Sequence, residues 1–371
     1  MKVCLLVPFG IDSHTAWAKA YQHHSQLEVK VYAMSGSHWK WRMHGAAVSL
    51  AKKLNEANEI PDLVLCTDMM DLAVFKSLLS SRFREVPICL YFHENQLTYP
   101  WSASDPDKKN HRDRHYAWIN FTSALVAERV FFNSAYHKKA FINALPDFLR
   151  AFPDHQEIAA VKTIAKKSEV LPLGTTLFPT NHREKPSPSP KHILWNHRWE
   201  YDKNPDSFFR LMFRLQEVGL DFRLHAVGRS FQRQPAIFKE AKERLAPHID
   251  TWGFVESTAS YRAILQQSDI LPVTAIHDFF GLSVVEAIHA GVYPLLPDRL
   301  AYPEHISPTE FPNHYYQDEE ELFIKLKEIL RSPEILENFE PIGLVKYDWK
   351  RVAPMYDQVF QQLCNFRHTE T

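Results

Sequence analysis

The sequence predicts an α/β protein built from two Rossmann-like, doubly wound domains that face each other across a cleft. Two observations support this fold class. Short apolar segments alternate with helical segments along the 371 residues, as in parallel sheets that are covered by helices. The chain is also longer than one hydrophobic core usually serves, which favours two domains.

The first domain is expected to span residues 1–178. Its strands are apolar without alternation, as strands buried on both faces of a parallel sheet usually are. These strands are expected at residues 2–9, 27–34, 61–68, 86–95, 129–134 and 168–174. Helical patterns separate them at residues 14–24, 45–57, 72–83 and 115–128.

A proline-rich polar segment, residues 179–191, predicts an interdomain linker. The alternation then restarts, so residues 192–345 are expected to form the second domain. Its strands are expected at residues 192–198, 222–228, 249–255, 270–275 and 292–297, with helices at 205–219, 238–248, 259–269 and 282–291. Residues 346–371 are predicted to form a C-terminal helix that packs back toward the first domain.

Composition restricts the function and the location. The net charge is −1, so any surface for a nucleic acid must be local. The four cysteines form no CxxC pair, which fits reduced thiols in a cytoplasmic protein. The apolar run at the N-terminus predicts a buried strand rather than a signal peptide. No apolar run approaches the roughly 20 residues that span a bilayer, so no membrane partner is expected.

The turn after the first strand of the second domain suits a diphosphate. Arg198 and Lys203 precede a helix that Pro205 would open. Their cationic groups and the free N–H groups of the helix start all favour phosphate oxygens. At the end of the next strand, Gly228 would let the backbone approach a ligand, and Arg229 could donate to it. The alternatives are solvated surface cations and an ordinary turn.

Two acids stand eight positions apart in HDFFGLSVVEAIHAG, residues 277–291. Asp278 is expected at the carboxyl end of a strand, where a helix N-cap is the simpler interpretation. Glu286 lies about two turns into the following helix. Its neighbours are aliphatic, so its carboxylate needs a partner, and the hydroxyls of a ribose would serve.

Together these residues resemble the nucleotide-sugar half of retaining glycosyltransferases with the GT-B fold. The resemblance implies that Arg198 and Lys203 bind the donor pyrophosphate. It further implies that Asp278, where the family usually has Glu, contacts the transferred sugar, and that Glu286 binds the ribose. The donor-binding set implied by the resemblance is Arg198, Lys203, Gly228, Arg229, Phe280, Gly281, Leu282 and Glu286.

Two segments of the first domain are rich in aromatic rings and histidine. SGSHWKWRMHGAA, residues 35–47, interleaves tryptophan with cations, which suits stacked bases and phosphates. The alternative is a surface loop whose tryptophans pack on the domain. In YFHENQLTYPW, residues 91–101, His93 ends a strand and could hydrogen-bond the sugar or orient an acceptor hydroxyl. The alternative is a structural histidine.

Both segments, and FNSAYHKKAF at residues 132–141, resemble the tRNA-queuosine mannosyltransferases. That resemblance implies transfer of mannose from GDP-mannose to the cyclopentenediol of queuosine at the wobble position of tRNA, with tRNA-Asp as the expected acceptor. The catalytic candidates are His93, Arg198, Lys203 and Asp278. The acceptor-side candidates are Ser13, His14, His38, Trp39, Lys40, Trp41, Arg42, Glu94 and Asn95.

A basic segment, residues 108–115, adds candidate tRNA contacts, with a solvated charged loop as the alternative. These contacts are Lys108, Lys109, Arg112 and Arg114. Asp105 and Asp107 resemble the Mg-binding DxD motif of another glycosyltransferase fold, but they lie in a polar loop rather than at a strand end. We therefore expect no metal ion and no cofactor.

Two other functions remain open from the sequence. The chain could be a glycosyltransferase with a glycan, a lipid or a small molecule as acceptor. It could also be a catalytically silent module that binds nucleotides or RNA, because a fold alone does not choose between such functions. The aromatic and cationic residues at 38–42 favour tRNA as the acceptor.

Overall fold

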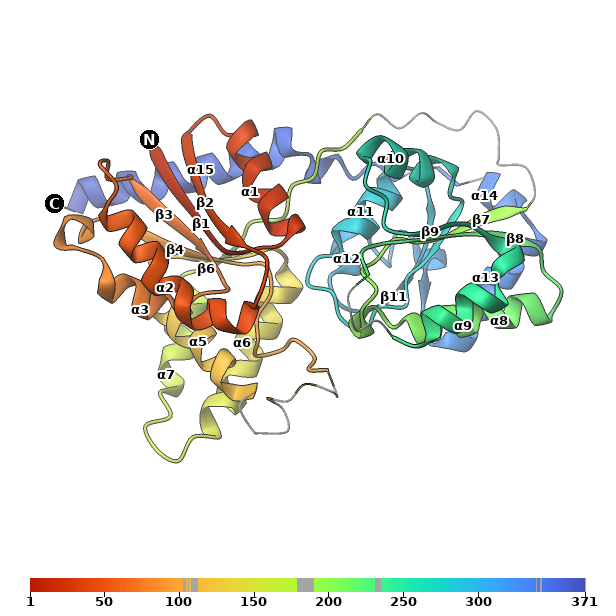
Figure 1. Ribbon diagram of the computed structural model, residues 1–371, viewed down its shortest axis with the longest axis horizontal. Helices are drawn as coiled ribbons and strands as arrows, with labels where there is room; N and C mark the ends of the chain where they lie inside the picture. The colour runs from red at the N-terminus through yellow and green to blue at the C-terminus, as the bar shows by residue number, and fades with distance from the viewer. Residues whose placement is uncertain are drawn as a thin grey trace. The chain divides into compact units, whose positions relative to one another are not determined.

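The chain divides into two compact units in the computed structural model (Figure 1). The described residues are 1–102, 105, 107, 113–178, 190–230, 235–337, 339–340 and 342–370. Unit 1 comprises Met1–Thr176 and Lys346–Thr371, and unit 2 comprises Leu177–Val345. Each unit contains one six-stranded sheet. All the strand pairings are parallel, so the predicted pair of doubly wound α/β sheets is confirmed.

The sheet of unit 1 has the strand order β2-β1-β3-β4-β5-β6. Its strands are β1 (Lys2–Gly10), β2 (Glu28–Ser35), β3 (Leu63–Thr67), β4 (Ile88–Phe92), β5 (Val130–Phe132) and β6 (Ser168–Val170). Successive side chains of β1 enter two different cores, since Leu5 belongs to one buried cluster and Leu6 to the other. Both faces of this sheet are therefore covered.

Two groups of helices cover the faces of this sheet. One face packs against α1 (Asp12–His24) and α15 (Trp349–Glu370). The other face packs against α2 (Trp39–Asn55), α3 (Leu72–Leu78), α5 (Asp113–Val126), α6 (Ala135–Arg150) and α7 (Ile158–Lys166). The carboxyl ends of β1, β3 and β4 lie at one edge of the sheet, where the loops that follow them meet.

The C-terminal helix α15 is held against α1 by a buried carboxylate. Asp357 accepts hydrogen bonds from the Tyr21 hydroxyl at 2.8 Å, the Ser25 hydroxyl at 2.6 Å and the Gln26 backbone N–H at 2.7 Å. Asp357 is 5% exposed. Residues more than 300 positions apart are thus joined in unit 1, and the carboxyl-terminal segment completes the core of this unit.

Replacing Asp357 with Asn should lower the free energy of unfolding by about 2 kcal/mol, because the amide keeps the shape but presents an N–H group to one of three donors. Urea denaturation followed by circular dichroism measures this loss. Asp147→Asn is the control, since the Asp147 side chain is 88% exposed. Equal stability of the two variants would contradict the assigned role of Asp357.

The sheet of unit 2 has the strand order β12-β11-β10-β7-β8-β9. Its strands are β7 (Lys191–Trp195), β8 (Phe222–Val227), β9 (Ile249–Gly253), β10 (Ile270–Pro272), β11 (Tyr293–Pro297) and β12 (Tyr315–Tyr316). Helices α8 (Pro205–Glu217), α9 (Ile237–Arg244) and α13 (Glu319–Arg331) pack on one face. Helices α10 (Thr258–Gln267) and α11 (Leu282–His289) lie on the opposite side (Figure 1).

Some predicted elements differ from the observed ones. Helix α2 begins at Trp39 rather than at residue 45, so the segment expected as a loop forms the first turns of a helix. No side chain caps that helix start, because His38 adopts a left-handed conformation without a cap hydrogen bond, so the sequence carries no start signal there. Lys191, expected in the linker, is the first residue of β7 and pairs with Phe222. Linker residues 179–189 lie outside the described residues.

Helices α6, α7 and α13 were not predicted as separate elements. The sequence carries start signals for two of them, since the side chains of Ser134 and Asp318 cap α6 and α13. Pro146 lies inside α6 and argued against a helix there. Within the described part of the chain, no helix is long and apolar enough to cross a membrane.

Candidate functional site

In unit 2, the loops that follow β7 and β10 meet around Lys203. The Lys203 ammonium lies 3.0 Å from Asp202 Oδ2 and 3.5 Å from Asp278 Oδ2, and it donates to the His277 carbonyl at 2.8 Å. Lys203 is 8% exposed and Asp202 is 0% exposed. The fold therefore brings together Lys203 and Asp278, two predicted residues that are distant in the sequence.

Arg198 extends this group toward solvent. Its Nη1 lies 3.2 Å from Glu200 Oε2, and its Nη2 lies 3.9 Å from Asp202 Oδ2. The Arg198 side chain is 38% exposed, so its guanidinium remains accessible to a ligand. Charges of alternating sign thus run from Arg198 through Asp202 and Lys203 to Asp278. The sequence analysis missed Asp202, although an acid beside a lysine that was predicted to bind phosphate was a usable signal.

The central ion pair is charged at neutral pH. Burial would lower the pKa of Lys203, but Asp202 and Asp278 outweigh burial, so the pKa of the ammonium is raised above its usual value. Burial would likewise raise the pKa of Asp202, but Lys203 and Arg198 outweigh it, so that pKa is lowered. Lys203 is therefore a permanent cation that is held in place before any substrate binds.

Two histidines beside this row are neutral at the same pH. Burial, reinforced by the positive charge of Lys203, lowers the pKa of His197 to about 4 and that of His277 to about 4. His197 Nδ1 lies 3.3 Å from the Ser283 hydroxyl. The histidines add hydrogen-bonding groups to the site without adding charge.

Glu286 is tied to the β7 loop through a tyrosine that the sequence analysis did not select. The Tyr261 hydroxyl, from α10, donates to Glu286 Oε2 at 3.2 Å. Asn196 Nδ2 donates to the Tyr261 oxygen at 3.1 Å and to the Ser283 carbonyl at 2.8 Å. Tyr261, Asn196 and Ser283 come from three different elements, so this network fixes the carboxylate relative to the end of β7.

We predict that Tyr261→Phe raises KM for the nucleotide-sugar donor about 5-fold with kcat nearly unchanged, since one hydrogen bond to a carboxylate that positions the substrate is lost. Steady-state kinetics at varied donor concentration measure this change, and the unfolding temperature controls for the fold. Unchanged KM in a folded Tyr261→Phe variant would show that the hydroxyl does not position Glu286.

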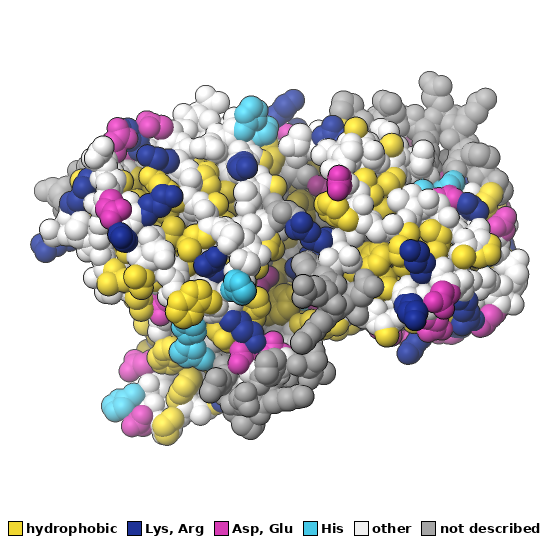
Figure 2. Space-filling model, in the orientation of Figure 1, with side chains coloured by type: hydrophobic (Ala, Val, Ile, Leu, Met, Phe, Trp, Pro, Cys, Tyr) yellow, Lys and Arg dark blue, Asp and Glu magenta, His cyan; other side chains and the backbone are white. Residues whose placement is uncertain are grey.

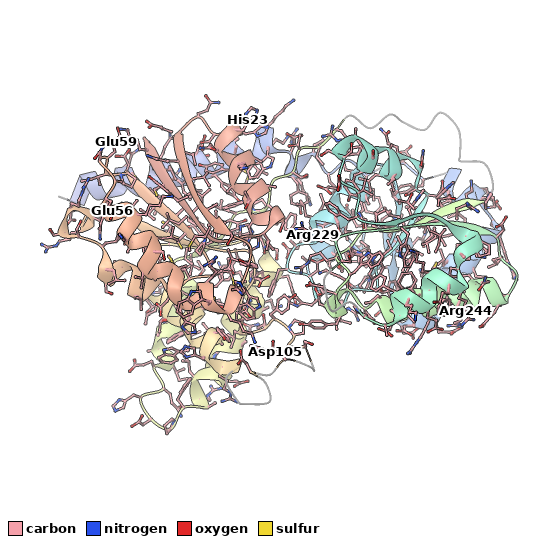
Figure 3. All side chains as sticks on the ribbon, in the orientation of Figure 1. His23, Glu56, Glu59, Asp105, Arg229 and Arg244 are labelled. Carbon is pink, nitrogen blue, oxygen red and sulfur yellow. The ribbon has the colours of Figure 1, made fainter. Side chains whose placement is uncertain are left out.

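The loops after β7 and β8 touch backbone to backbone, which requires a glycine. A Cβ added at Gly228 would lie 1.9 Å from the His197 carbonyl oxygen, and the Gly228 φ of 154° disfavours any side chain. The Trp199 N–H donates to the Arg229 carbonyl at 3.0 Å. Arg229, which is labelled in Figure 3, therefore lies in a loop directly against the one that carries Arg198.

Arg229 also contacts an aromatic residue from the next strand. Its guanidinium carbon lies 5.6 Å from the ring centroid of Phe254, and Phe254 is 58% exposed. Exposed rings of this kind offer a face to planar groups such as bases. The sequence analysis did not select Phe254, because a single phenylalanine after a strand carries no motif.

The loop before α11 is shaped by Gly281. Gly281 has φ 84° and is itself the N-cap of α11, so the alternative interpretation of Asp278 as the N-cap is wrong. Asp278 Oδ2 instead accepts a hydrogen bond from the Tyr302 hydroxyl at 3.3 Å. Phe280 is 3% exposed, so its side chain belongs to the core, and Leu282 is the first residue of α11.

In unit 1, His93 lies directly after β4 in a buried aromatic cluster. Its backbone N–H donates to Asp68 Oδ1 at 2.9 Å. Its ring stacks on His14 at 4.3 Å and meets the edge of Trp17 at 4.5 Å. His93 Nε2 has no hydrogen-bond partner among the described residues. The fold thus pairs two predicted residues, His14 and His93, and adds Asp68, which the sequence analysis missed.

Both buried polar groups are shifted toward their neutral forms. Burial, together with His14 and His137, lowers the pKa of His93 well below its usual value. Burial, together with Glu94, raises the pKa of Asp68 well above its usual value. The neutral imidazole of His93 is able to accept a hydrogen bond from a substrate hydroxyl or to donate one to it.

The other acceptor-side candidates near His93 differ in their exposure and hydrogen bonding. Ser13 is exposed in the first turn of α1. Glu94 Oε1 accepts a hydrogen bond from the Gln96 side chain at 3.1 Å. Asn95 is 0% exposed, and its Oδ1 accepts from the backbone N–H groups of Leu97 and Thr98, so its side chain holds the loop.

The start of α2 separates two tryptophans. Trp39 packs against Tyr116 at 5.1 Å between ring centroids, whereas Trp41 is 64% exposed. Lys40 pairs with Asp105 and Asp107, both at 2.6 Å, so its charge is already compensated within the fold. The aspartates of the DxD sequence are therefore partners of Lys40.

The remaining candidate cations of unit 1 are scattered. Arg42 Nη2 donates to the Ser35 hydroxyl at 2.8 Å, and Arg114 is exposed. Lys108, Lys109 and Arg112 lie outside the described residues. On the face shown in Figure 2, Lys and Arg side chains are interspersed with Asp and Glu side chains.

Solved structures share this two-domain architecture. The chain is similar to Anabaena Alr3699/HepE in complex with UDP, with a TM-score of 0.65 and 14% identity over 98% of this chain and 100% of that one. It is also similar to sucrose-phosphate synthase from Thermosynechococcus elongatus, with a TM-score of 0.67 and 13% identity over 98% and 99%. The family model of glycosyl transferases group 1 matches residues 178–343. The protein is a glycosyltransferase with the GT-B fold.

Two further matches are to tRNA-queuosine alpha-mannosyltransferases. The family model of the tRNA-queuosine alpha-mannosyltransferase N-terminal domain matches residues 2–175. A Drosophila melanogaster protein named tRNA-queuosine alpha-mannosyltransferase is 29% identical over 380 residues, covering 97% of this chain and 96% of its own. Both matches confirm the resemblance to the tRNA-queuosine alpha-mannosyltransferases that was inferred from the sequence.

Proposed function

We propose that this enzyme transfers mannose from GDP-mannose to the cyclopentenediol of queuosine in tRNA, with tRNA-Asp as the substrate. The proposal rests on the family match of unit 1, residues 2–175, because in a GT-B enzyme the two domains serve different substrates. The Drosophila relative named tRNA-queuosine alpha-mannosyltransferase matches nearly the whole chain, including unit 2. Unit 2 supplies cations suited to a nucleotide diphosphate.

In the proposed reaction, the cations of unit 2 stabilise the leaving group. As the glycosidic bond breaks, the anomeric carbon becomes oxocarbenium-like and the diphosphate gains negative charge. Arg198, 38% exposed, and the permanently charged Lys203 would meet that charge where it develops. Configuration is retained, and the leaving phosphate helps to take the proton of the acceptor hydroxyl.

The roles proposed for the other side chains follow from their surroundings. Asp278, held by Lys203 and Tyr302, contacts the transferred sugar. Glu286, held by Tyr261, binds the ribose hydroxyls. His93 offers an unpartnered Nε2 and hydrogen-bonds a sugar or acceptor hydroxyl. Arg198 and Lys203 are the cations that would meet the diphosphate, and we propose that transfer needs no metal ion.

We also propose that the enzyme works in the cytoplasm, where its tRNA acceptor is found. All four cysteines are free, and Cys4, Cys66 and Cys89 are buried, as expected for a protein of a reducing compartment. Localisation of a tagged full-length chain by fluorescence microscopy would test this assignment.

The decisive experiment compares acceptors and donors directly. The chain is incubated with total tRNA from queuosine-containing and queuosine-deficient cells, each with a panel of labelled sugar nucleotides, and the nucleosides are analysed by mass spectrometry. We expect hexosylated queuosine only with GDP-mannose and only in the queuosine-containing tRNA. Transfer from another sugar nucleotide would overturn the donor, and transfer only to glycans, lipids or small molecules would overturn the acceptor.

A further inference from the structure

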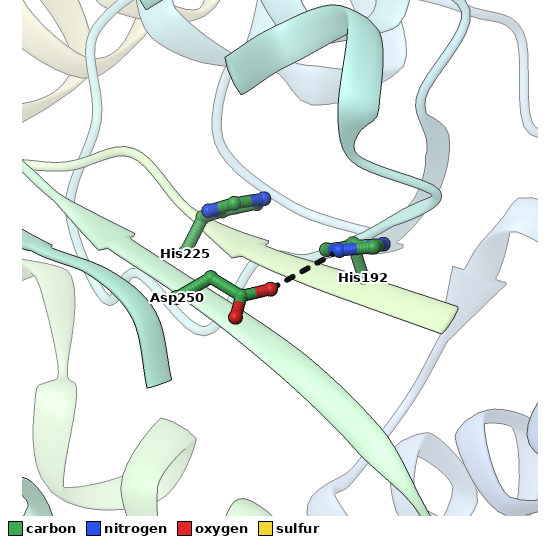
Figure 4. A group of neighbouring side chains, drawn as sticks. All are labelled: His192, His225 and Asp250. Atoms are coloured by element: carbon green, nitrogen blue, oxygen red, sulfur yellow. Dashed lines mark ion pairs between the residues drawn. The ribbon is translucent and has the colours of Figure 1, made fainter. Parts of the chain in front are cut away.

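Three side chains of unit 2 lie close together on its sheet (Figure 4). His192, His225 and Asp250 come from the neighbouring strands β7, β8 and β9. One ligand atom of each lies within 4.8 Å of the other two. His192 is the second residue of β7, whereas Arg198 follows the other end of that strand, so this cluster is separate from the diphosphate site.

The two histidines of the cluster each have an oxygen near the outer ring nitrogen. His225 Nδ1 lies 3.1 Å from the Thr251 hydroxyl, within hydrogen-bonding distance. His192 Nδ1 lies 3.6 Å from Asp269 Oδ2, too far for a hydrogen bond. Protein ligands to metal ions are commonly oriented in this way, with the distal ring nitrogen of a histidine bound by an oxygen.

One inner atom of the cluster, His225 Nε2, is available to a ligand, and the other two lie close to each other. His225 is 2% exposed, and its Nε2 is buried without a hydrogen-bond partner among the described residues. A buried polar atom left in this state is costly. His192 Nε2 lies 3.1 Å from Asp250 Oδ2, close to the spacing of about 3.3 Å between tetrahedral ligands that each lie roughly 2.0 Å from a zinc ion.

We propose that His192, His225 and Asp250 form a binding site for a divalent transition-metal ion of the zinc class. Two imidazole nitrogens and one carboxylate oxygen suit such an ion, and water would complete the coordination. The site would clamp β7, β8 and β9 together. Its role is structural, so it is independent of the proposed metal-free sugar transfer.

Binding requires one local adjustment. The rings of His192 and His225 are nearly parallel, at 11° and 5.1 Å between centroids, so His192 must rotate about χ2, a torsion with a broad profile for imidazoles. Arg223 donates to Asp250 Oδ1 at 2.8 Å. That bond uses the other carboxylate oxygen and leaves Oδ2 for the metal.

The test uses the untagged full-length chain, first treated with a chelator and then titrated with zinc chloride by isothermal titration calorimetry. We expect one saturable site per chain and a higher unfolding temperature in the presence of zinc. Cobalt(II) should give the visible absorption of a tetrahedral site without a thiolate charge-transfer band. Absence of one-to-one binding, or a thiolate band, would overturn the proposal.

Variants then localise the site. His192→Gln and Asp250→Asn should abolish one-to-one zinc binding, and both positions are partly exposed, at 24% and 25% of the side chain. Thr251→Val should weaken binding about 10- to 100-fold, because it removes the group that orients His225. His248→Gln, outside the cluster, should bind as wild type. Wild-type affinity in His192→Gln and Asp250→Asn would place any bound zinc elsewhere and refute the assignment.

Discussion

Replacing Lys203 with Met is expected to lower kcat by about 100- to 1,000-fold, as seen when one preorganised group that stabilises developing charge is removed from an active site. The ammonium is 8% exposed and lies between Asp202 and Asp278. Its loss would leave the buried Asp202 carboxylate without its nearest cation, so the site would also repel a diphosphate. Radiometric transfer assays at saturating donor and acceptor measure the effect.

A double variant separates catalysis from folding. Breaking a buried ion pair by removing one partner typically costs about 3–5 kcal/mol, because a charge remains uncompensated. Lys203→Met combined with Asp202→Asn removes both charges. We expect its unfolding free energy to recover toward the wild-type value while kcat stays low. Wild-type turnover in this folded double variant would refute the role of Lys203 at the leaving group.

The sequence predicted those parts of the fold and the site that local pattern determines. Apolar runs located most strands of both sheets, because strands buried on both faces leave no polar alternation. Chain order then placed Arg198, Lys203 and Asp278 after strand ends, and parallel strands bring such ends to one edge. The fold confirms that Lys203 and Asp278 are neighbours. Their binding roles remain predictions.

Two of the residues that were missed act through neighbours from other elements. Tyr261 of α10 reaches Glu286 of α11, with which it forms a hydrogen bond. Asp68 binds the His93 backbone from a neighbouring strand end. None of these pairings has a characteristic spacing, so single-sequence reasoning had no signal for them.

The two tryptophans of the WKW sequence show the same limit. The sequence analysis predicted the same role for Trp39 and Trp41, because both flank Lys40. The start of α2 at Trp39 turns them to different surroundings, one packed against Tyr116 and the other 64% exposed. The position at which the helix begins decides which ring is exposed to a substrate. Because His38 makes no capping hydrogen bond, the sequence did not indicate that position.

Trp41 is therefore the ring that we expect to stack on an unpaired base of the tRNA, if tRNA is the acceptor as proposed. A Cβ added at Gly45 would lie 2.8 Å from Trp41 Cε2, so the indole rests on bare helix backbone one turn later and is preorganised. Trp41→Ala should weaken tRNA binding about 10- to 100-fold, the usual contribution of one base–aromatic stack. Fluorescence anisotropy with labelled tRNA measures the affinity.

The controls distinguish stacking from general disruption of unit 1. Trp41→Phe keeps an aromatic face and should retain most of the affinity, whereas Gly45→Val should displace the indole and weaken binding while Trp41 is still present. Trp118→Ala, at a ring 38% exposed on α5, should leave tRNA affinity unchanged. Equal affinity of the Trp41→Ala variant and the wild type would remove α2 from the acceptor surface. The proposed sugar transfer would survive that result, because the diphosphate site lies entirely in unit 2.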